Sequence, residues 1–258
     1  ISPYLAFGVV SIREILDLLS RAREQIAQSE LAPKAQSQWK QSFKSFESRL
    51  HWHCHFIQKL ESEPELEFRS AHRGLNCMRN VGEQTAEEKH RLATWIEGRT
   101  GYPMVDACMR MLKATGWVNF RMRAMLVAFA SYQLWLDWRH TAPLLAQEFL
   151  DYEPGIHYPQ LQMQAGVTET GTIRIYNPIK NSDQHDSEGI FIKKWIPELA
   201  NIPPLLIHEP WKLGSIDQQL YECEIGKDYP FPIVDIEETR KYASDAICSI
   251  RKKQENIL

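Results

Sequence analysis

Residues 100–139 constrain the fold more than any other stretch of this chain. A Gly-Tyr-Pro turn opens a run of helical spacing, and a Thr-Gly-Trp turn at 115–117 ends it. A second apolar run then carries Arg121 and Arg123 before it closes on Leu-Asp-Trp-Arg at 136–139. Two apolar helices that carry fixed cations predict a pair suited to holding a large, anionic, aromatic group.

Helical spacing also dominates the rest of the sequence. Ser11 precedes an apolar repeat and predicts a helix start. Pro33 predicts the start of a second helix, whose apolar stripe ends before Pro64. Thr85 and Glu88 predict a capping box for a helix that runs through Trp95. Further helices are expected over residues 102–114, 118–136, 141–150, 186–195 and 235–254.

The segments between these helices are expected to be irregular. Residues 62–84 and 165–184 are interpreted as loops, residues 151–155 as a turn, and the Pro-rich segment 202–234 as a wrapping segment. The best strand candidate, TIRIY at 172–176, is short. We therefore expect one all-α domain over residues 1–258.

Composition narrows the class of protein. With 43% hydrophobic and 24% charged residues the chain should be globular. A net charge of -3 does not predict a nucleic-acid partner by itself, so a DNA face requires a local patch. Five scattered cysteines without a CxxC pair predict neither a zinc site nor a disulfide framework and fit a cytoplasmic protein.

The ends and the apolar runs bear on membranes and processing. The longest apolar run, 124–136, is too short to span a bilayer, so no membrane segment is expected. The first residues, ISPYLAFG, lack the basic start and the cleavage site of a signal peptide. Because the initiator Met is missing too, we expect a fragment of a longer protein.

Eight segments resemble the FAD-binding domain of the photolyase/cryptochrome family, in the family's order and over nearly the whole chain. They are SPYLAFG (2–8), TGYPMVDACMRML (100–112), TGW (115–117), LDWR (136–139), RIYNPIK (174–180), EGIFIKKWIPEL (188–199), HEPW (208–211) and YPFPIVD (229–235). The resemblance implies an all-helical domain that binds FAD folded back on itself. It also implies that the family's N-terminal α/β antenna domain is missing from this chain. The sequence contains no GxGxxG, so a Rossmann-type flavin site is not expected.

The resemblance assigns six residues to the cofactor side: Ser2, Phe120, Arg123, Asp151, Glu153 and His157. It implies that Arg123 and Asp151 pair beside the flavin, where a fixed cation stabilises added negative charge. Glu153 matches an acidic position at the polar edge of the ring, and His157 matches the position that faces flavin N5. From the residues alone, a structural ion pair, a helix-terminus carboxylate and a hydrogen-bonded turn histidine are the alternatives.

Two of the cofactor residues stand in altered surroundings. Ser2 matches a serine of the phosphate clamp, whose preceding Thr-Ser element is absent, so weaker FAD retention is expected. Phe120 stands where the family has an Asn.

The family's electron path, a line of three Trp, is predicted to be broken. Trp138 matches its middle member, but Leu161 or Met163 stands at the flavin-proximal position and Thr85 near the distal one. A substitute route would need other aromatic residues, and the sequence offers five candidates: Trp95, Tyr132, Trp135, Tyr152 and Tyr158.

Arg49 and Trp52 fall on the helix that faces both flavin and lesion in photolyases. A flat indole stacks well on an extruded base, although Trp52 also fits a core aromatic stripe. Arg49 replaces the Glu that repairing photolyases usually have, and Met163 replaces their second pocket Trp. A pocket for cyclobutane dimers is therefore not visible, while another lesion or single-stranded DNA stays open.

These observations lead to one main hypothesis and two alternatives. The first is a blue-light, FAD-dependent, DNA photolyase-like lyase, which in the family transfers an electron from excited reduced FAD to a flipped lesion. Trp138, Arg49 and Trp52 would carry its catalytic side, and DNA, single-stranded or with an extruded base, would be its partner. The alternatives are a cryptochrome-like photosensor without repair activity and a helical scaffold that has lost FAD. No metal site is expected, because His51, His53 and His55 do not share one helical face.

Overall fold

The computed structural model describes residues 1–168 and 174–255, and these ranges are built from helices and loops. Within them, β pairing is confined to one isolated bridge between Ile225 and Tyr229. The predicted all-α class is confirmed. Of the strand candidate at 172–176, residues 174–176 are described and form no strand, and residues 172–173 lie outside the described residues. Among the residues described, no helix combines the length and apolarity needed to cross a membrane.

The chain divides into two compact units, and each is described by itself. One unit comprises Ile1–Glu67 and Leu150–Pro159, and the other comprises Phe68–Phe149 and Gln160–Leu258. The expectation of a single domain stays a prediction.

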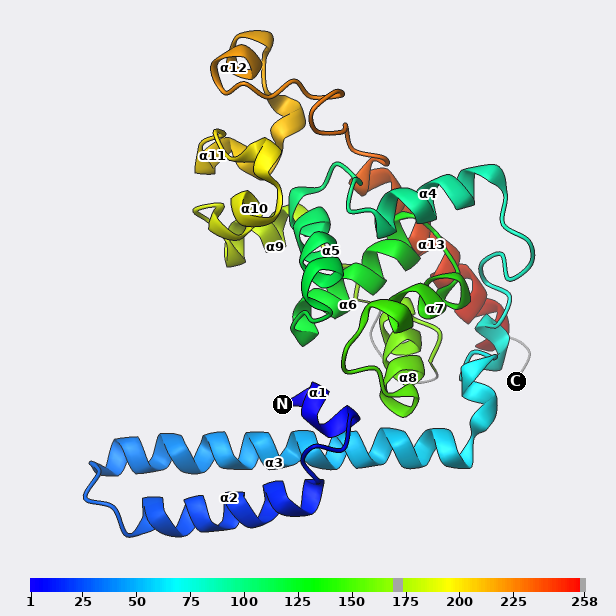
Figure 1. Ribbon diagram of the computed structural model, residues 1–258. Coiled ribbons are helices and arrows are strands. Elements are labelled where there is room, and N and C mark those ends of the chain that lie inside the picture. Colours follow the sequence, from blue (N-terminus) through cyan, green and yellow to red (C-terminus); the bar gives the residue numbers. More distant parts are fainter. Residues whose placement is uncertain (169–173, 256–258) are drawn as a thin grey trace. The chain divides into compact units, whose positions relative to one another are not determined.

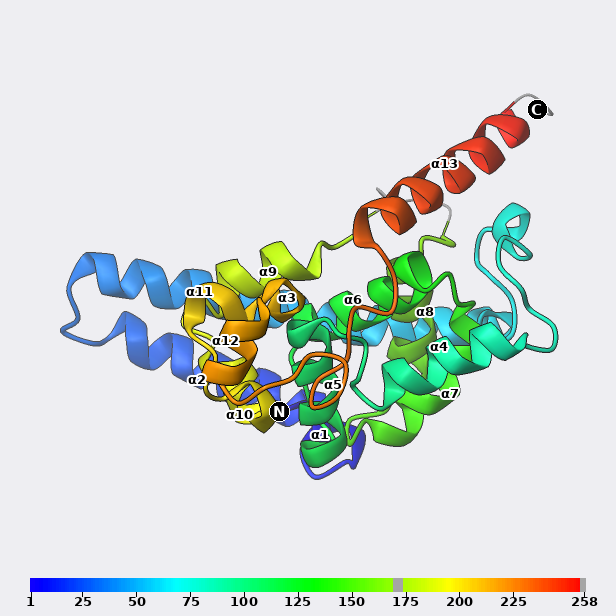
Figure 2. The same ribbon diagram turned by 90° about the horizontal axis from the view of Figure 1, so that it is seen from above.

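The first unit is built on a helical hairpin. It contains α1 (Ser2–Ala6), α2 (Ile12–Ala27), α3 (Pro33–Ser62) and η1 (Pro64–Glu67). Figures 1 and 2 show α2 and α3 side by side and antiparallel. An ion pair of 2.6 Å between Arg23 and Glu47 joins the two helices.

Both predicted starts in this hairpin are confirmed. The Ser11 hydroxyl accepts from the Glu14 N–H at 3.2 Å, and the Glu14 carboxylate accepts from the Ser11 N–H at 2.7 Å. This capping box satisfies two backbone donors that would otherwise lack partners at the helix start. Pro33 opens α3, and α3 ends at Ser62, ahead of Pro64 as predicted.

The second segment of this unit packs against α3. A Cβ on Gly155 would lie 2.6 Å from Ile57 Cα, so only a glycine lets the two backbones approach so closely. The turn predicted over 151–155 is shorter than expected, because Pro154 already starts α8 (Pro154–Ala165). This helix, which the sequence analysis did not predict, begins in the first unit and ends in the second.

The second unit is a cluster of short helices around α5. Its elements are η2 (Arg73–Leu75), α4 (Ala86–Ile96), α5 (Pro103–Thr115), α6 (Phe120–Ala128), the π-helical η3 (Phe129–Gln133), α7 (Trp138–Glu148), α9 (Pro178–His185), α10 (Ile190–Trp195), η4 (Pro197–Leu199), α11 (Pro204–Ile207), η5 (Pro210–Lys212), α12 (Ser215–Leu220) and α13 (Ile236–Glu255). The capping box predicted for Thr85 and Glu88 is present at the start of α4.

Two of the later sequence segments quoted above, 188–199 and 229–235, contact the segment that forms α5. The fully buried Asp106 carboxylate accepts from the Tyr229 hydroxyl at 2.6 Å, and Arg110 binds both oxygens of Glu198 at 2.9 Å. The Tyr102 hydroxyl donates to the Val234 carbonyl at 2.7 Å. Hydrogen bonds and an ion pair therefore join the TGYPMVDACMRML segment to the two later segments.

Several predicted elements differ from those observed. The loop expected over 62–84 contains η1 and η2, and the Pro-rich segment 202–234 contains α11, η5 and α12. The helix expected over 118–136 ends its α-helical part at Ala128 and continues as the π-helix η3, after which Trp135 adopts a left-handed backbone with φ 56°. The loop expected over 165–184 contains α9, which Asn177 caps. The helix expected over 186–195 starts only at Ile190, because Gly189 has φ 66° and interrupts it.

Candidate functional site

Arg49 and Trp52 both lie on the exposed surface of α3. Trp52 is 49% exposed, so it is not a core aromatic. Its ring stacks on Phe56 with centroids 5.5 Å apart and meets the edge of His55 at 5.6 Å. These two contacts hold one face of the indole in a fixed orientation, which lowers the entropy cost of stacking a further flat group on it.

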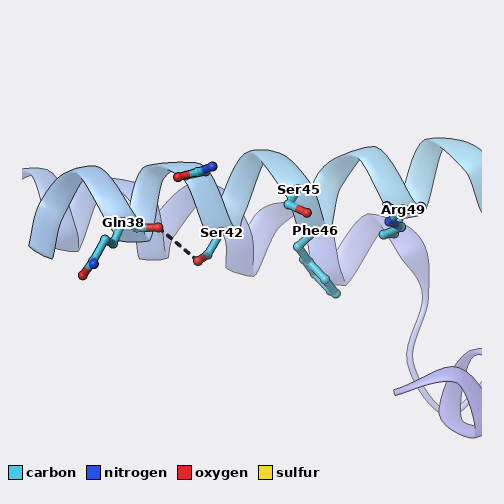
Figure 3. Close-up of a pocket in the computed structure, with 6 residues that line it drawn as sticks. Gln38, Ser42, Ser45, Phe46 and Arg49 are labelled. Carbon is cyan, nitrogen blue, oxygen red and sulfur yellow. Dashed lines mark hydrogen bonds between the residues drawn. The ribbon is translucent and has the colours of Figure 1, made fainter. Parts of the chain in front are cut away.

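A shallow pocket on α3 extends from Arg49 toward the start of the helix. Figure 3 shows residues that line it, and its lining consists of Gln38, Gln41, Ser42, Ser45, Phe46 and Arg49. The Ser42 hydroxyl donates to the Gln38 carbonyl at 3.0 Å, a bond within the helix. Apart from Phe46, every lining side chain carries hydrogen-bond donors, and none carries a carboxylate.

The predicted acidic and histidine residues gather at the start of α8. Glu153 precedes the helix, its carboxylate accepts from the Gly155 N–H at 3.2 Å, and its carbonyl accepts from the His157 N–H at 2.8 Å. His157 is buried, and its ring lies between Tyr152 at 5.2 Å and Tyr158 at 5.3 Å. Glu153 is thus a carboxylate that caps the start of α8.

His53 of α3 interacts electrostatically with Glu153. Its Nδ1 is buried and has no hydrogen-bond partner among the described residues. Burial lowers the pKa of His53, and the Glu153 carboxylate partly opposes that shift. The ring is therefore favoured in its neutral form at pH 7, with one nitrogen left to bond another group.

The second unit contains Arg123 and Phe120, both on α6. The Arg123 guanidinium donates through Nε to the Val118 carbonyl at 2.9 Å, and its Cζ lies 4.2 Å from the centre of the Phe149 ring. These contacts fix the cation on a rigid helix, as a flavin-side Arg requires. Phe120 is 60% exposed at the first position of α6, which Asn119 caps. The pairing of Arg123 with Asp151 stays a prediction, since the two residues belong to different units.

Trp138 is fully buried at the start of α7. Its indole N–H donates to the Ser70 hydroxyl at 3.2 Å, and the Arg139 guanidinium lies 4.8 Å from its ring centre. Of the two residues predicted at the missing Trp position, Leu161 is buried and Met163 is 45% exposed. Leu161 is therefore the one that could replace a core indole.

Two of the candidate aromatic residues for a substitute route share one buried cation. The Arg79 guanidinium lies 4.7 Å from the Trp135 ring centre and 5.5 Å from that of Tyr132, and both its terminal nitrogens lack partners among the described residues. Burial lowers the pKa of Arg79 to about 10, so it stays charged at pH 7. A positive charge this close raises the energy of an electron hole on either ring. This argues against Tyr132 and Trp135 as stations of a substitute route.

Comparison with known proteins identifies the family. Residues 46–249 match the family model described as the FAD binding domain of DNA photolyase. The chain belongs to this family. The deoxyribodipyrimidine photo-lyase of Alkalihalophilus pseudofirmus is 31% identical over 245 residues, which cover 94% of this chain and 47% of that protein. Cryptochrome DASH of Gloeobacter violaceus is 36% identical over 151 residues, which cover 58% of this chain and 30% of that protein.

Solved structures agree with this assignment. A class III photolyase from Agrobacterium tumefaciens superposes with a TM-score of 0.82 at 26% identity and covers 97% of this chain and 49% of that chain. A Synechocystis cryptochrome superposes with a TM-score of 0.81 at 29% identity and covers 95% and 48%. The photolyase-family domain described here thus spans about half the length of the relatives it matches.

The cofactor of the photolyase-family domain is FAD, and the residues present suit it. The chain supplies a hydroxyl, a cation and carboxylates of the kinds that bind a diphosphate and the polar edge of a flavin. The unpartnered Nδ1 of His53 is a buried polar atom of the sort that a bound group satisfies. The predicted family, fold class and cofactor are therefore confirmed, while the individual site residues remain predictions.

Proposed function

We propose that the photolyase-family domain holds FAD and uses blue light to act on DNA, as a photolyase-like lyase with an altered lesion pocket. The observation that carries the proposal is the exposed Trp52 with Arg49 one helical turn before it, on a surface whose pocket lining has no carboxylate. An exposed indole beside a cation suits an extruded base and its phosphate.

As the resemblance implies, six residues would hold the cofactor: Ser2, Phe120, Arg123, Asp151, Glu153 and His157. When bound, FAD supplies light absorption and one-electron chemistry. Arg123, fixed by Val118 and Phe149, would place a positive charge that favours the reduced ring. His157, buried between two tyrosines, would exclude water from that part of the site.

The DNA would bind to side chains of α3. Trp52, held against Phe56, would stack on the base, and Arg49 would donate to a phosphate oxygen. Since Arg49 stands where repairing photolyases usually have a Glu, the substrate would be held by its backbone charge rather than by a carboxylate at the lesion.

The test compares two tryptophans of α3. Trp52 and Trp39 are both 49% exposed, but they point to different sides of the helix, thirteen residues apart. Trp52→Ala should weaken binding of an oligonucleotide with an extruded base about fivefold or more, because stacking contributes about 1–3 kcal/mol per base. Trp39→Ala serves as the matched control and should change binding less than twofold. Equal losses in both variants would contradict the proposed base contact.

A cryptochrome-like photosensor is the alternative function. The replaced lesion residues favour it, and cryptochromes stand among the relatives alongside photolyases. Illuminating the FAD-loaded protein with a dimer-containing oligonucleotide separates the two. Loss of dimers supports the lyase, whereas flavin photoreduction with intact dimers supports the sensor.

A further inference from the structure

A polar stripe runs along α3 ahead of Arg49. It consists of Gln38, Gln41, Ser45 and Arg49, whose spacings of three, four and four residues place them on one helical face. All four are exposed, and Figure 3 shows three of them, Gln38, Ser45 and Arg49, along the same stretch of helix. Trp52 follows at the next spacing of three. From Gln38 to Trp52 the face is about 21 Å long, at 1.5 Å per residue.

The charges of α3 make this face attractive to an anion. The helix carries five Lys and Arg residues against two Glu. Of these, Glu47 is the one acidic residue before Trp52, and its carboxylate is turned to α2, where it pairs with Arg23 at 2.6 Å. Lys34 lies one turn before Gln38 and extends the donor face toward the helix start. Along the stripe, amide, hydroxyl and guanidinium donors are thus unopposed by a carboxylate.

The apolar side of α3 lies elsewhere. Leu50 is buried, and Gln36 donates to the Ser29 carbonyl at 3.0 Å in the turn between α2 and α3. These residues and Glu47 share the helix side that faces α2, roughly opposite the stripe at 100° per residue. The stripe is therefore not needed to hold the hairpin together, which leaves its donors for a ligand.

We propose that this stripe binds the sugar–phosphate backbone of a single-stranded nucleic acid that leads to the base on Trp52. The inference rests on the proposed function and extends its DNA contact by about four helical turns. Amides, hydroxyls and Arg are the side chains that most often bind phosphate and sugar oxygens, and they do so without reading sequence. A protein partner is less favoured, because the stripe has a single apolar side chain, Phe46, at its edge.

The test is a charge-reversal experiment on the whole chain, with oligo(dT) as the probe, in the dark. The double variant Gln41→Glu/Ser45→Glu adds two negative charges to the stripe. Lys40→Glu changes the net charge by the same amount, and position 40 lies opposite Arg49 because nine residues are two and a half turns. The double variant should raise the Kd tenfold or more, whereas Lys40→Glu should raise it less than threefold.

A second measurement reports on phosphate contacts directly. Arg49→Gln should lower the slope of log Kd against log salt concentration by about 0.7, the value for one phosphate contact on a single strand. Circular dichroism and thermal melting should show all variants folded, since every changed side chain is exposed.

Two results would contradict the proposal that the stripe binds nucleic acid. Binding by the double variant that equals the parent's would show that no nucleic acid lies there, and equal losses in Lys40→Glu would show that overall charge, not this face, attracts the probe. Failure of the proposed function is separate. If the protein binds oligo(dT) through the stripe but leaves dimers intact under light, only the proposed lyase activity is contradicted. If it repairs dimers under light and the stripe variants bind as the parent does, only the proposed nucleic-acid binding by the stripe is contradicted.

Discussion

Replacing Asp106 by Asn tests how the family's sequence segments hold the fold together. One carboxylate oxygen of Asp106 accepts from the Thr100 N–H at 2.8 Å and the Thr100 hydroxyl at 2.7 Å. The other accepts from the Gly101 N–H at 3.0 Å and the Tyr229 hydroxyl at 2.6 Å. In Asp106→Asn, one of these oxygens becomes an NH₂ donor. If the NH₂ group replaces the oxygen that binds Gly101 and Tyr229, the Tyr229 hydroxyl can turn to accept a hydrogen bond from it, but the Gly101 N–H loses its acceptor.

The expected cost follows from these contacts. A buried donor without a partner costs about 1–3 kcal/mol, and bonds to a neutral amide are about 1 kcal/mol weaker than bonds to a charged acceptor. Burial raises the pKa of Asp106, so the carboxylate also carries a desolvation cost that Asn removes. The balance predicts that the free energy of unfolding falls by about 2–4 kcal/mol.

The assay is urea unfolding followed by circular dichroism, with Asp183→Asn as the matched control. Asp183 is exposed on α9, and its substitution should change stability by less than about 0.5 kcal/mol. A stability of Asp106→Asn equal to the parent's would refute the reasoning. The pH dependence gives a second check. Because the folded pKa of Asp106 is raised above 3.8, the parent should lose part of its stability as the pH rises through and above 3.8, and Asp106→Asn should lack that loss.

Three further predictions concern single residues. Gly101→Ala should prevent stable folding, because residue 101 has a φ of +81° and the new Cβ would lie 2.4 Å from the Phe231 carbonyl oxygen. The control variant Gly82→Ala makes no such contact and should melt at the same temperature as the parent. His53→Gln should flatten the stability curve below pH 6.5, where the parent loses stability as the pH falls because burial lowers the pKa of His53; an unchanged curve in urea titrations would contradict this. Because the predicted Trp line is broken at the flavin-proximal position, Trp138→Phe should leave photoreduction of the FAD-loaded protein unchanged, measured by the loss of blue absorbance; a slower rate would show a substitute route through Trp138.

Much of the fold could be predicted because the start of a helix depends on a few residues that are close together in the sequence. Ser11 and Thr85 formed the expected capping boxes, since such a box depends only on residues three apart. Asn177 before Pro178 carried the same kind of signal for α9 and was overlooked among the surrounding loop residues. The π-helix after Ala128 had no local signal, because its extra residue depends on how the surrounding core packs.

The candidate site was predictable in part. The exposure of Arg49 and Trp52 on one helix agrees with the expectation that they face a ligand, and it removes the core-aromatic alternative for Trp52. The polar stripe was missed, although Gln38, Gln41 and Ser45 repeat at helical spacing and its signal was visible in the sequence. The electrostatic effect of Arg79 on Trp135 could not have been predicted, because the two residues are brought together only by the tertiary fold.

The central claim is that this chain holds FAD through Arg123, and an FAD titration tests it most directly. The purified 258-residue chain should bind FAD in a near one-to-one ratio, turn yellow with blue absorbance and release FAD on denaturation. Arg123→Gln should weaken that binding about tenfold or more, because a charged hydrogen bond contributes about 1.5–3 kcal/mol. A colourless protein after reconstitution, from a chain shown to be folded, would contradict the account.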